Sequence, residues 1–153
     1  MENIIELRTE KDIHYKVVDC IRKHFPRMQI IAGLGELQDT TMKRCDAYRK
    51  GYVGGQPDVL ILNQTDQWNG FAIELKSPSG KWTLSNKQET YLENLEAIRY
   101  KTLVSNNYGE ILIELTNYYR DMLKDPRHLC PHCNKVFKFQ KALKKHLRTK
   151  HPN

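Results

Sequence analysis

The apolar positions of the chain alternate between the 3.6-residue period of a helix and short continuous runs of strand character. Helical spacing is expected over residues 9–26, 39–50, 85–98 and 110–122, and strand character over residues 28–32, 57–62, 71–76 and 101–105. The order of elements is therefore helix, strand, helix, two strands, helix, strand, helix. Such an order predicts an α/β core in which a small mixed sheet is flanked by helices.

Local signals fix several of these boundaries. Thr9 is an N-cap candidate with acidic residues in the turn that follows, and Pro26 ends the helical period. Ser85 and Gln88 have the spacing of a capping box at the start of another helix. The polar segment 63–70 contains the Asn, Asp and Gly residues that suit a hairpin connection between two strands.

Three charged residues lie on the strands of the predicted hairpin. Asp58 is at the entry of the first strand, and Glu74 and Lys76 point to one face of the second because they are two residues apart. If residue 58 lies opposite residue 74 or 76, all three share a face, whereas a one-residue slip would separate them. Such a group on a buried sheet edge costs desolvation free energy, for which a divalent cation can compensate. The alternative is that Asp58 caps a turn and that Glu74 and Lys76 form an exposed cross-strand pair.

Two short motifs frame this hairpin, Pro57-Asp58 in its first half and Glu74-Leu75-Lys76 in its second. They resemble the motif of the PD-(D/E)xK nuclease superfamily. Gly55, the short hairpin and Gln88 on the following helix look like the VRR-NUC family of that superfamily, over roughly residues 8–120. The resemblance implies a restriction-endonuclease-like core that hydrolyses phosphodiester bonds with Mg²⁺ or Mn²⁺.

The resemblance also implies a role for each residue of this site. Asp58, Glu74 and the Leu75 carbonyl would hold the metal ion, which would supply charge and lower the pKa of an attacking water. Lys76 would hold or help to deprotonate that water and would pair with the scissile phosphate.

Two further residues have both a functional and a structural interpretation. Glu10 matches the position at which members of the family often place an acid near the metal, but the helix dipole also favours an acid in a first turn. Gln88 would lie beside the active site and orient water or phosphate, or it would only finish the cap that begins at Ser85. His14 stands where the family often has Gln.

The net charge of +7 is distributed unevenly along the chain. Residues 121–153 contain nine Lys or Arg and two Asp, whereas residues 1–120 contain sixteen basic and sixteen acidic residues. The whole excess of positive charge therefore lies in the last fifth of the chain. This asymmetry indicates a C-terminal module that meets a polyanion.

The same segment carries a metal-binding pattern. It reads Cys130-x2-Cys133-x12-His146-x4-His151, with Phe137 and Leu143 at the usual apolar positions of a two-cysteine, two-histidine zinc finger. A segment of about 23 residues cannot bury enough core to fold alone, so the zinc ion must supply the stability. We expect a linker over residues 121–128 and a ββα finger over residues 129–153. Cys20 and Cys45 are expected to be plain buried thiols.

Basic residues of the finger suit contacts with DNA phosphates. They are Lys138, Lys141, Lys144, Lys145, Arg148 and Lys150. Of the three base-reading positions of such a finger, Phe139, Ala142 and Lys145, only Lys145 can make a strong base contact. One finger spans about 3 bp, too little to define a site. Binding of a protein partner is the alternative.

These patterns predict a metal-dependent DNA endonuclease with a basic zinc finger. Stand-alone members of the family that it resembles cut branched or flapped DNA in replication and recombination, and several act as homodimers on four-way junctions. Recognition of DNA structure is therefore expected. The alternatives are a sequence-targeted restriction or homing endonuclease, and a non-catalytic nucleic-acid binder with a nuclease fold.

The expected location follows from the absence of membrane and export signals. No apolar run approaches the ~20 residues that cross a bilayer, and residues 1–10 lack a signal-peptide core. A soluble, intracellular protein is expected. By resemblance, the finger favours a eukaryotic or viral origin, and so the nucleus or a viral replication site.

Overall fold

The computed structural model describes residues 7–33, 40–124, 128–130, 132–133, 135–137 and 140–151. The chain divides into two compact units, Met1–Met122 and Leu123–Asn153, called the N-terminal unit and the finger unit below. Among the described residues, no helix combines the length and the apolar character needed to cross a membrane.

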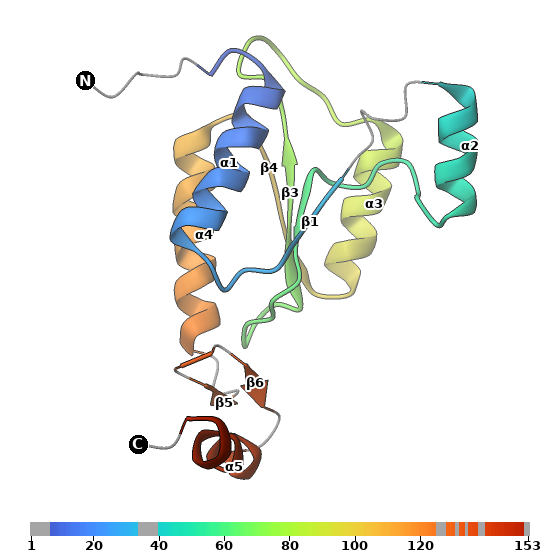
Figure 1. Ribbon diagram of the computed structural model, residues 1–153. Helices are drawn as coiled ribbons and strands as arrows, with labels where there is room; N and C mark the ends of the chain where they lie inside the picture. Colours follow the sequence, from blue (N-terminus) through green and yellow to red (C-terminus); the bar gives the residue numbers. More distant parts are fainter. Residues whose placement is uncertain are drawn as a thin grey trace. The chain divides into compact units, whose positions relative to one another are not determined.

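The helices and strands of the N-terminal unit follow the predicted order (Figure 1). They are α1 (Glu10–His24), β1 (Ile30–Ala32), α2 (Thr41–Arg49), β2 (Val59–Ile61), β3 (Gly70–Leu75), α3 (Asn86–Ala97), β4 (Tyr100–Ser105) and α4 (Tyr108–Lys124). One sheet has the strand order β1-β2-β3-β4, in which β1, β2 and β3 pair antiparallel and β4 pairs with β3 in parallel. The predicted α/β core with a small mixed sheet is confirmed.

An apolar core holds one face of the sheet against two helices. Alternate residues of β3, namely Phe71, Ile73 and Leu75, are fully buried and belong to one cluster with α1 and α4. The cluster members on these helices recur at helical spacing: Ile13, Val17, Cys20 and Ile21 in α1, and Ile111, Leu115, Tyr118 and Met122 in α4. Figure 1 shows α1 and α4 on one side of the sheet and α3 on the other. Because side chains alternate along a strand, Glu74 points toward the α3 side.

The predicted helix starts form by the expected contacts. The Thr9 hydroxyl accepts a hydrogen bond from the N–H of Asp12, whose carboxyl accepts the N–H of Thr9. Ser85 and Gln88 make the same reciprocal pair of contacts at the start of α3. α1 ends before Pro26, as predicted.

α2 differs from the other helices of the N-terminal unit because it buries no residue. Met42, Cys45 and Tyr48 recur every three residues, but Thr41 and Arg49 lie among them, so no wide apolar stripe is available to pack against the core. The prediction that Cys45 is buried is therefore wrong, whereas Cys20 is buried as expected. The helix begins at Thr41, and the predicted start at Asp39 lies outside the described residues.

The finger unit has the predicted ββα order. β5 (His128–Leu129) pairs antiparallel with β6 (Val136–Phe137), and α5 (Gln140–Lys150) follows.

The predicted linker 121–128 differs from the structure at both ends, since α4 continues through Lys124 and β5 begins at His128. The helix extends because Met122, one turn after Tyr118, still packs into the core of the N-terminal unit.

Candidate functional site

The register of the β2–β3 hairpin brings Asp58 to Glu74. Val59 pairs with Ile73, and the same register continued by one residue sets Asp58 opposite Glu74. Asp58 Oδ2 also accepts a hydrogen bond of 2.7 Å from the backbone N–H of Leu75. The condition for a shared face is therefore met. This hydrogen bond involves the backbone N–H of Leu75 and not its carbonyl oxygen. The role of the Leu75 carbonyl as a metal ligand therefore stays a prediction.

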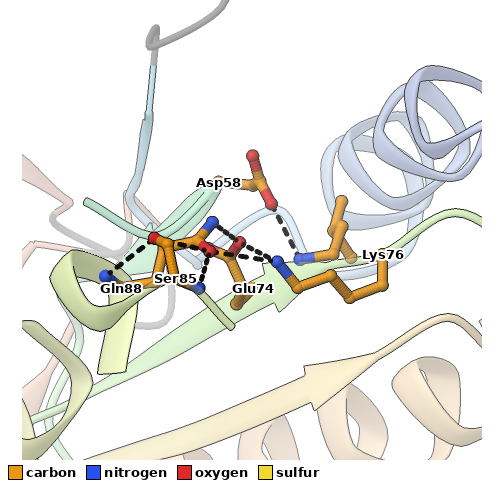
Figure 2. Close-up of polar contacts among 6 residues, drawn as sticks. Asp58, Glu74, Lys76, Ser85 and Gln88 are labelled. Atoms are coloured by element: carbon orange, nitrogen blue, oxygen red, sulfur yellow. Dashed lines mark hydrogen bonds and ion pairs between the residues drawn. The ribbon is translucent and has the colours of Figure 1, made fainter. Parts of the chain in front are cut away.

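Glu74 and Lys76 form a buried ion pair at the end of β3 (Figure 2). Lys76 Nζ lies 2.9 Å from Glu74 Oε1, and Lys76 and Glu74 are only 7% and 3% exposed, respectively. The alternative of an exposed cross-strand pair is therefore wrong. Removing two such charges from water costs several kcal/mol per ion, so a buried pair of this kind is weak evidence of a stabilising role.

Gln88 combines the two roles that the sequence left open. Its Oε1 accepts the N–H of Ser85 at 3.0 Å, which closes the capping box of α3. Its Nε2 donates a short hydrogen bond to Glu74 Oε1, and Lys76 Nζ lies 3.3 Å from Gln88 Oε1. Figure 2 shows the Gln88 side chain between Ser85 and Glu74. The cap of α3 therefore holds an amide against the buried carboxyl.

Gly55 allows the start of α3 to come this close. Its φ is +94°, in the region that side chains rarely adopt. A Cβ at this position would overlap the carbonyl oxygen of Lys87 and lie 2.9 Å from the backbone nitrogen of Gln88. The glycine of the motif is thus required by its backbone angle and by its neighbours, and it positions Gln88.

A cavity of about 320 Å³ opens beside these residues. Four of the predicted site residues line it: Glu10, Asp58, Glu74 and Gln88. Lys76 is not part of the lining, but it contacts two residues that are. The structure thus brings the predicted acids of the first helix and of both strands to one space.

The pKa of Glu74 shows how these charges act on one another. Burial raises the pKa of its carboxyl to about 7; the hydrogen bond from Lys76 opposes this shift, and the charges of Asp58 and Glu10 add to it. A divalent cation in the cavity would favour the charged forms of all three acids. The residues present therefore fit such an ion.

Tyr52 also lines the cavity, and the sequence did not single it out. Burial, and then the charges of Asp58 and Glu74, raise the pKa of its hydroxyl, so the phenol lies within the field of both acids. The sequence signal that could have indicated Tyr52 is Gly51, a glycine directly before it that follows the end of α2. In the structure Gly51 has a φ of +94°. Three further basic or titratable residues line the cavity: Lys11, His14 and Lys87.

The four predicted zinc ligands converge in the finger unit. The ligand atoms of Cys130, Cys133, His146 and His151 all lie within 4.8 Å of one another. Across the part of the chain that the structure describes, no other group of three or more Cys, His, Asp or Glu side chains converges in this way. Glu10, Asp58 and Glu74 of the N-terminal unit line one cavity, but their carboxylate oxygens do not lie as close to one another as the four zinc-ligand atoms do.

The protonation of these ligands suits zinc. His151 Nε2 is buried and has no hydrogen-bond partner among the described residues. Burial, and then the charge of His151, lowers the pKa of His146. Burial acts to raise the pKa of Cys130, but the N–H groups of Cys133 and His132 outweigh it and lower that pKa. Neutral imidazole and thiolate are the forms that bind the metal, so the four residues can hold a zinc ion.

The exposed side of α5 is basic. A shallow depression on it is lined by Lys141, Ala142, Lys144, Lys145, Arg148 and Thr149. Lys150 is exposed as well. Lys138 and the base-reading candidate Phe139 lie outside the described residues.

The chain is similar to a solved structure described as a VRR_NUC domain protein. The TM-score is 0.60 at 18% sequence identity, over 75% of this chain and 91% of that one. No protein-family model and no curated protein matches the sequence. At this identity the similarity is one of fold. The chain therefore has the fold of a VRR_NUC domain protein, as its motifs indicated, together with a Cys2His2 cluster that fits a small zinc site.

Proposed function

We propose that the chain is a metal-dependent DNA endonuclease that hydrolyses phosphodiester bonds. The observation that carries this proposal is the buried group of Asp58, Glu74 and Lys76, tied to Gln88 within the fold of a VRR_NUC domain protein. Such a group costs desolvation free energy that folding does not require. Catalysis is a reason to keep it.

Asp58, Glu74 and Glu10 would hold the metal ion, Mg²⁺ or Mn²⁺, with the Leu75 carbonyl. When bound, such an ion stabilises charge on the phosphoryl oxygens and activates water. The fit is supported by the cavity that the three acids share and by the raised pKa of Glu74.

The chain's own residues would orient the reactants. Lys76 would hold the attacking water and pair with the scissile phosphate, because its ammonium is fixed between Glu74 and Gln88. Gln88 would fix the direction of the Glu74 carboxyl, since its Nε2 donates to that carboxyl while its Oε1 is bound in the cap. A carboxyl fixed in this way has little freedom to turn away from the cavity.

The finger unit would hold zinc and bind a duplex part of the substrate. The support is the converging ligand set and the basic, exposed side of α5. The phosphate contacts would come from Lys138, Lys141, Lys144, Lys145, Arg148 and Lys150. Since one finger spans about 3 bp, it would add affinity and little sequence preference.

The substrate is proposed to be branched, flapped or four-way-junction DNA formed in replication, repair or recombination. A small N-terminal unit and one finger offer little surface for reading bases, so recognition would depend on DNA structure. A homodimer would present two such sites to one junction.

The test is cleavage of labelled DNA by the whole protein. Linear, flapped and four-way substrates of shared sequence are incubated with Mg²⁺, with Mn²⁺ or with neither. We expect metal-dependent cleavage that prefers one of the branched forms whatever the flanking sequence. Equal cutting of linear DNA at a fixed sequence would favour a sequence-targeted enzyme. No cleavage of any substrate would favour a non-catalytic binder.

The role of the finger is tested by binding across salt concentrations. Each phosphate contact contributes a slope near −0.9 to the dependence of affinity on salt. Residues 1–124 without the finger should bind scrambled duplexes more weakly and with a flatter slope than the whole chain. Unchanged affinity and slope would make a protein the partner of the finger.

A further inference from the structure

α2 is an exposed helix at the periphery of the N-terminal unit (Figure 1). None of its residues is buried, and every one except Ala47 is exposed to solvent. Core packing therefore does not explain why this segment is helical, and its stability comes from its two ends. The hydroxyl of Thr40 caps the first turn by accepting the N–H of Lys43 at 3.2 Å. A helix kept in this way leaves most of its surface exposed to solvent.

The charge of α2 is opposite to that of the rest of its unit. Residues 41–50 carry four basic residues and one acidic residue, whereas the remainder of residues 1–120 carries twelve basic and fifteen acidic residues. The acidic residue, Asp46, is already paired with Lys50 at 2.5 Å. This balance makes α2 a positive element on an otherwise acidic unit, which favours a polyanionic partner.

One face of α2 combines this charge with an aromatic ring. This face is formed by Thr41, Arg44, Cys45, Tyr48 and Arg49, which have the spacing of neighbours on one helix face. Tyr48 is 73% exposed. A large exposed ring between two arginines has no role in the core. It matches the stacking surfaces on which proteins hold unpaired bases.

The end of α2 connects this face to the cavity of the candidate site. Gly51, at φ +94°, donates its N–H to the carbonyl of Tyr48 at 3.0 Å. The N–H of Tyr52 bonds to the carbonyl of Ala47 at 2.9 Å, which completes a Schellman motif. Tyr52 lines the cavity with Asp58 and Glu74. The backbone hydrogen bonds therefore fix the Tyr48 face within one helical turn of a residue of the candidate site.

We propose that α2 binds a single-stranded segment of the nucleic-acid substrate, with Tyr48 stacked on an unpaired base and Arg44 and Arg49 on the flanking phosphates. This proposal rests on the function proposed above and adds its substrate class: DNA with unpaired nucleotides beside the bond that is cut. In a duplex the base faces are stacked on one another and are closed to a side chain. An exposed tyrosine therefore distinguishes single strands from duplexes, whereas the arginines alone would not.

A second copy of the chain is a poorer occupant of this surface. Two copies of α2 would bring together helices that each carry a net positive charge, and like charges across an interface disfavour association.

The test is binding of the whole protein to a 15-nucleotide oligothymidine and to a 15-bp duplex, with no divalent metal ion added. Because cleavage is not measured, failure of the proposed nuclease activity leaves this test intact. Tyr48→Ala should weaken binding of the oligothymidine by roughly 5- to 150-fold, the range expected when one base no longer stacks, and leave duplex binding unchanged. Tyr48→Phe, which keeps the ring, should bind as the wild type does. Tyr15→Ala removes another exposed tyrosine, on α1, and serves as the matched control.

A second variant tests the arginines. Arg44→Ala with Arg49→Ala should weaken binding of the oligothymidine and reduce the slope of affinity against salt by about 1.4, because each phosphate neutralised on a single strand contributes about 0.7 to that slope. Lys23→Ala, an exposed cation at the end of α1, should change neither quantity. If Tyr48→Ala lowers the melting temperature, this double variant carries the test alone.

Three results would overturn the proposal. One is wild-type affinity for the oligothymidine in Tyr48→Ala and in the double arginine variant. Another is an equal loss of single-strand and duplex binding in Tyr48→Ala. The third is a change from dimer to monomer in the α2 variants by sedimentation, which would make this face an interface between copies of the chain.

Discussion

The two units of the chain hold their polar side chains together in different ways. In the N-terminal unit, Glu74 and Lys76 lie at the end of a strand whose residues are all buried, and hydrogen bonds from Lys76 and Gln88 fix the Glu74 carboxyl. In the finger unit, two Cys and two His side chains converge on one another, and one of them, His151, has a buried nitrogen without a partner among the described residues.

This difference indicates what each unit needs in order to fold. The N-terminal unit has an apolar core between its sheet and two helices, so its candidate site should form before any metal ion binds. None of the described residues of the finger unit belongs to that core, so we expect zinc to supply the stability of the finger unit. The candidate site of the N-terminal unit would thus form without its metal ion, whereas the zinc site of the finger unit would form only when zinc binds.

The largest effect is expected from removing zinc. Apparent zinc-binding free energies of such fingers are about 10–16 kcal/mol, so chelation or Cys130→Ser should unfold the finger unit entirely. The N-terminal unit should keep its own melting transition. Circular dichroism and calorimetry with and without a chelator provide the measurement.

Cys45→Ser is the matched control for this prediction, because Cys45 is an exposed cysteine outside the ligand cluster. It should leave both units folded and zinc bound. A single transition that shifts as a whole on chelation would contradict the contrast between the units.

A smaller effect is expected at the glycine of the candidate site. Gly55→Ala should destabilise the N-terminal unit by about 3 kcal/mol, because an alanine at φ +94° is strained and its Cβ would overlap the backbone of Lys87. Gly51→Ala has the same φ but nothing within 4 Å of its Cβ, so it should cost only about 1 kcal/mol. Urea unfolding compares the two. Equal losses of unfolding free energy in the two variants would show that the close approach of Gly55 to the start of α3 does not contribute to stability.

The raised pKa of Glu74 predicts how stability depends on pH without divalent metal. Between pH 4.5 and about 7 the unfolded chain loses the Glu74 proton while the folded chain keeps it, so stability falls as pH rises through that window and is flat beyond it. Each pKa unit corresponds to about 1.4 kcal/mol, and screening by solvent reduces the total to on the order of 2 kcal/mol. Glu74→Gln should abolish this fall.

Glu93→Gln, an exposed acid on α3, should keep the fall in stability with pH and so serves as the control. Added Mn²⁺ should stabilise the wild type more at pH 8 than at pH 5, because a cation favours the charged carboxyl. Equal stabilisation by Mn²⁺ at pH 5 and pH 8 would argue against metal binding at Glu74. The measurement is thermal unfolding across pH.

The smallest effect on stability is expected for Gln88→Glu. A carboxylate closes a capping box as well as an amide does, so the start of α3 should be kept. The donor to Glu74 is lost, and the two carboxyls repel when both are charged. We expect a loss of about 1 kcal/mol at pH 8, less at pH 5, and a large loss of cleavage. Full cleavage activity in this variant would leave Gln88 with only its structural role.

The parts of the structure that sequence could predict depend on short-range contacts. Thr9 and Ser85 begin helices through hydrogen bonds three residues away, and the period-2 pattern of β3 sets which side of the sheet carries Glu74. The register of β2 and β3 needed only a choice between two alternatives, and the pairing of Val59 with Ile73 selects the one that sets Asp58 opposite Glu74.

The parts that sequence could not predict depend on how distant segments meet. Tyr52 lies in the cavity because the end of α2 turns there, and no periodicity of its own marks it. The residue type of Cys45 predicts a buried thiol, and its exposure follows from the position of α2, which buries none of its residues. The double role of Gln88 could not be predicted without knowing that Gly55 lets the start of α3 approach the end of β3.

The central claim is that the buried group at the end of β3 performs metal-dependent cleavage of DNA. Its most direct test compares cleavage of the preferred DNA substrate in Mg²⁺ by the whole wild-type protein, Glu74→Gln, Lys76→Ala and the control Glu93→Gln, all purified identically. The account predicts that Glu74→Gln and Lys76→Ala lose activity by on the order of a hundredfold or more, while Glu93→Gln and the DNA affinity of all variants stay unchanged. Undiminished Mg²⁺-dependent cleavage in Glu74→Gln would contradict it.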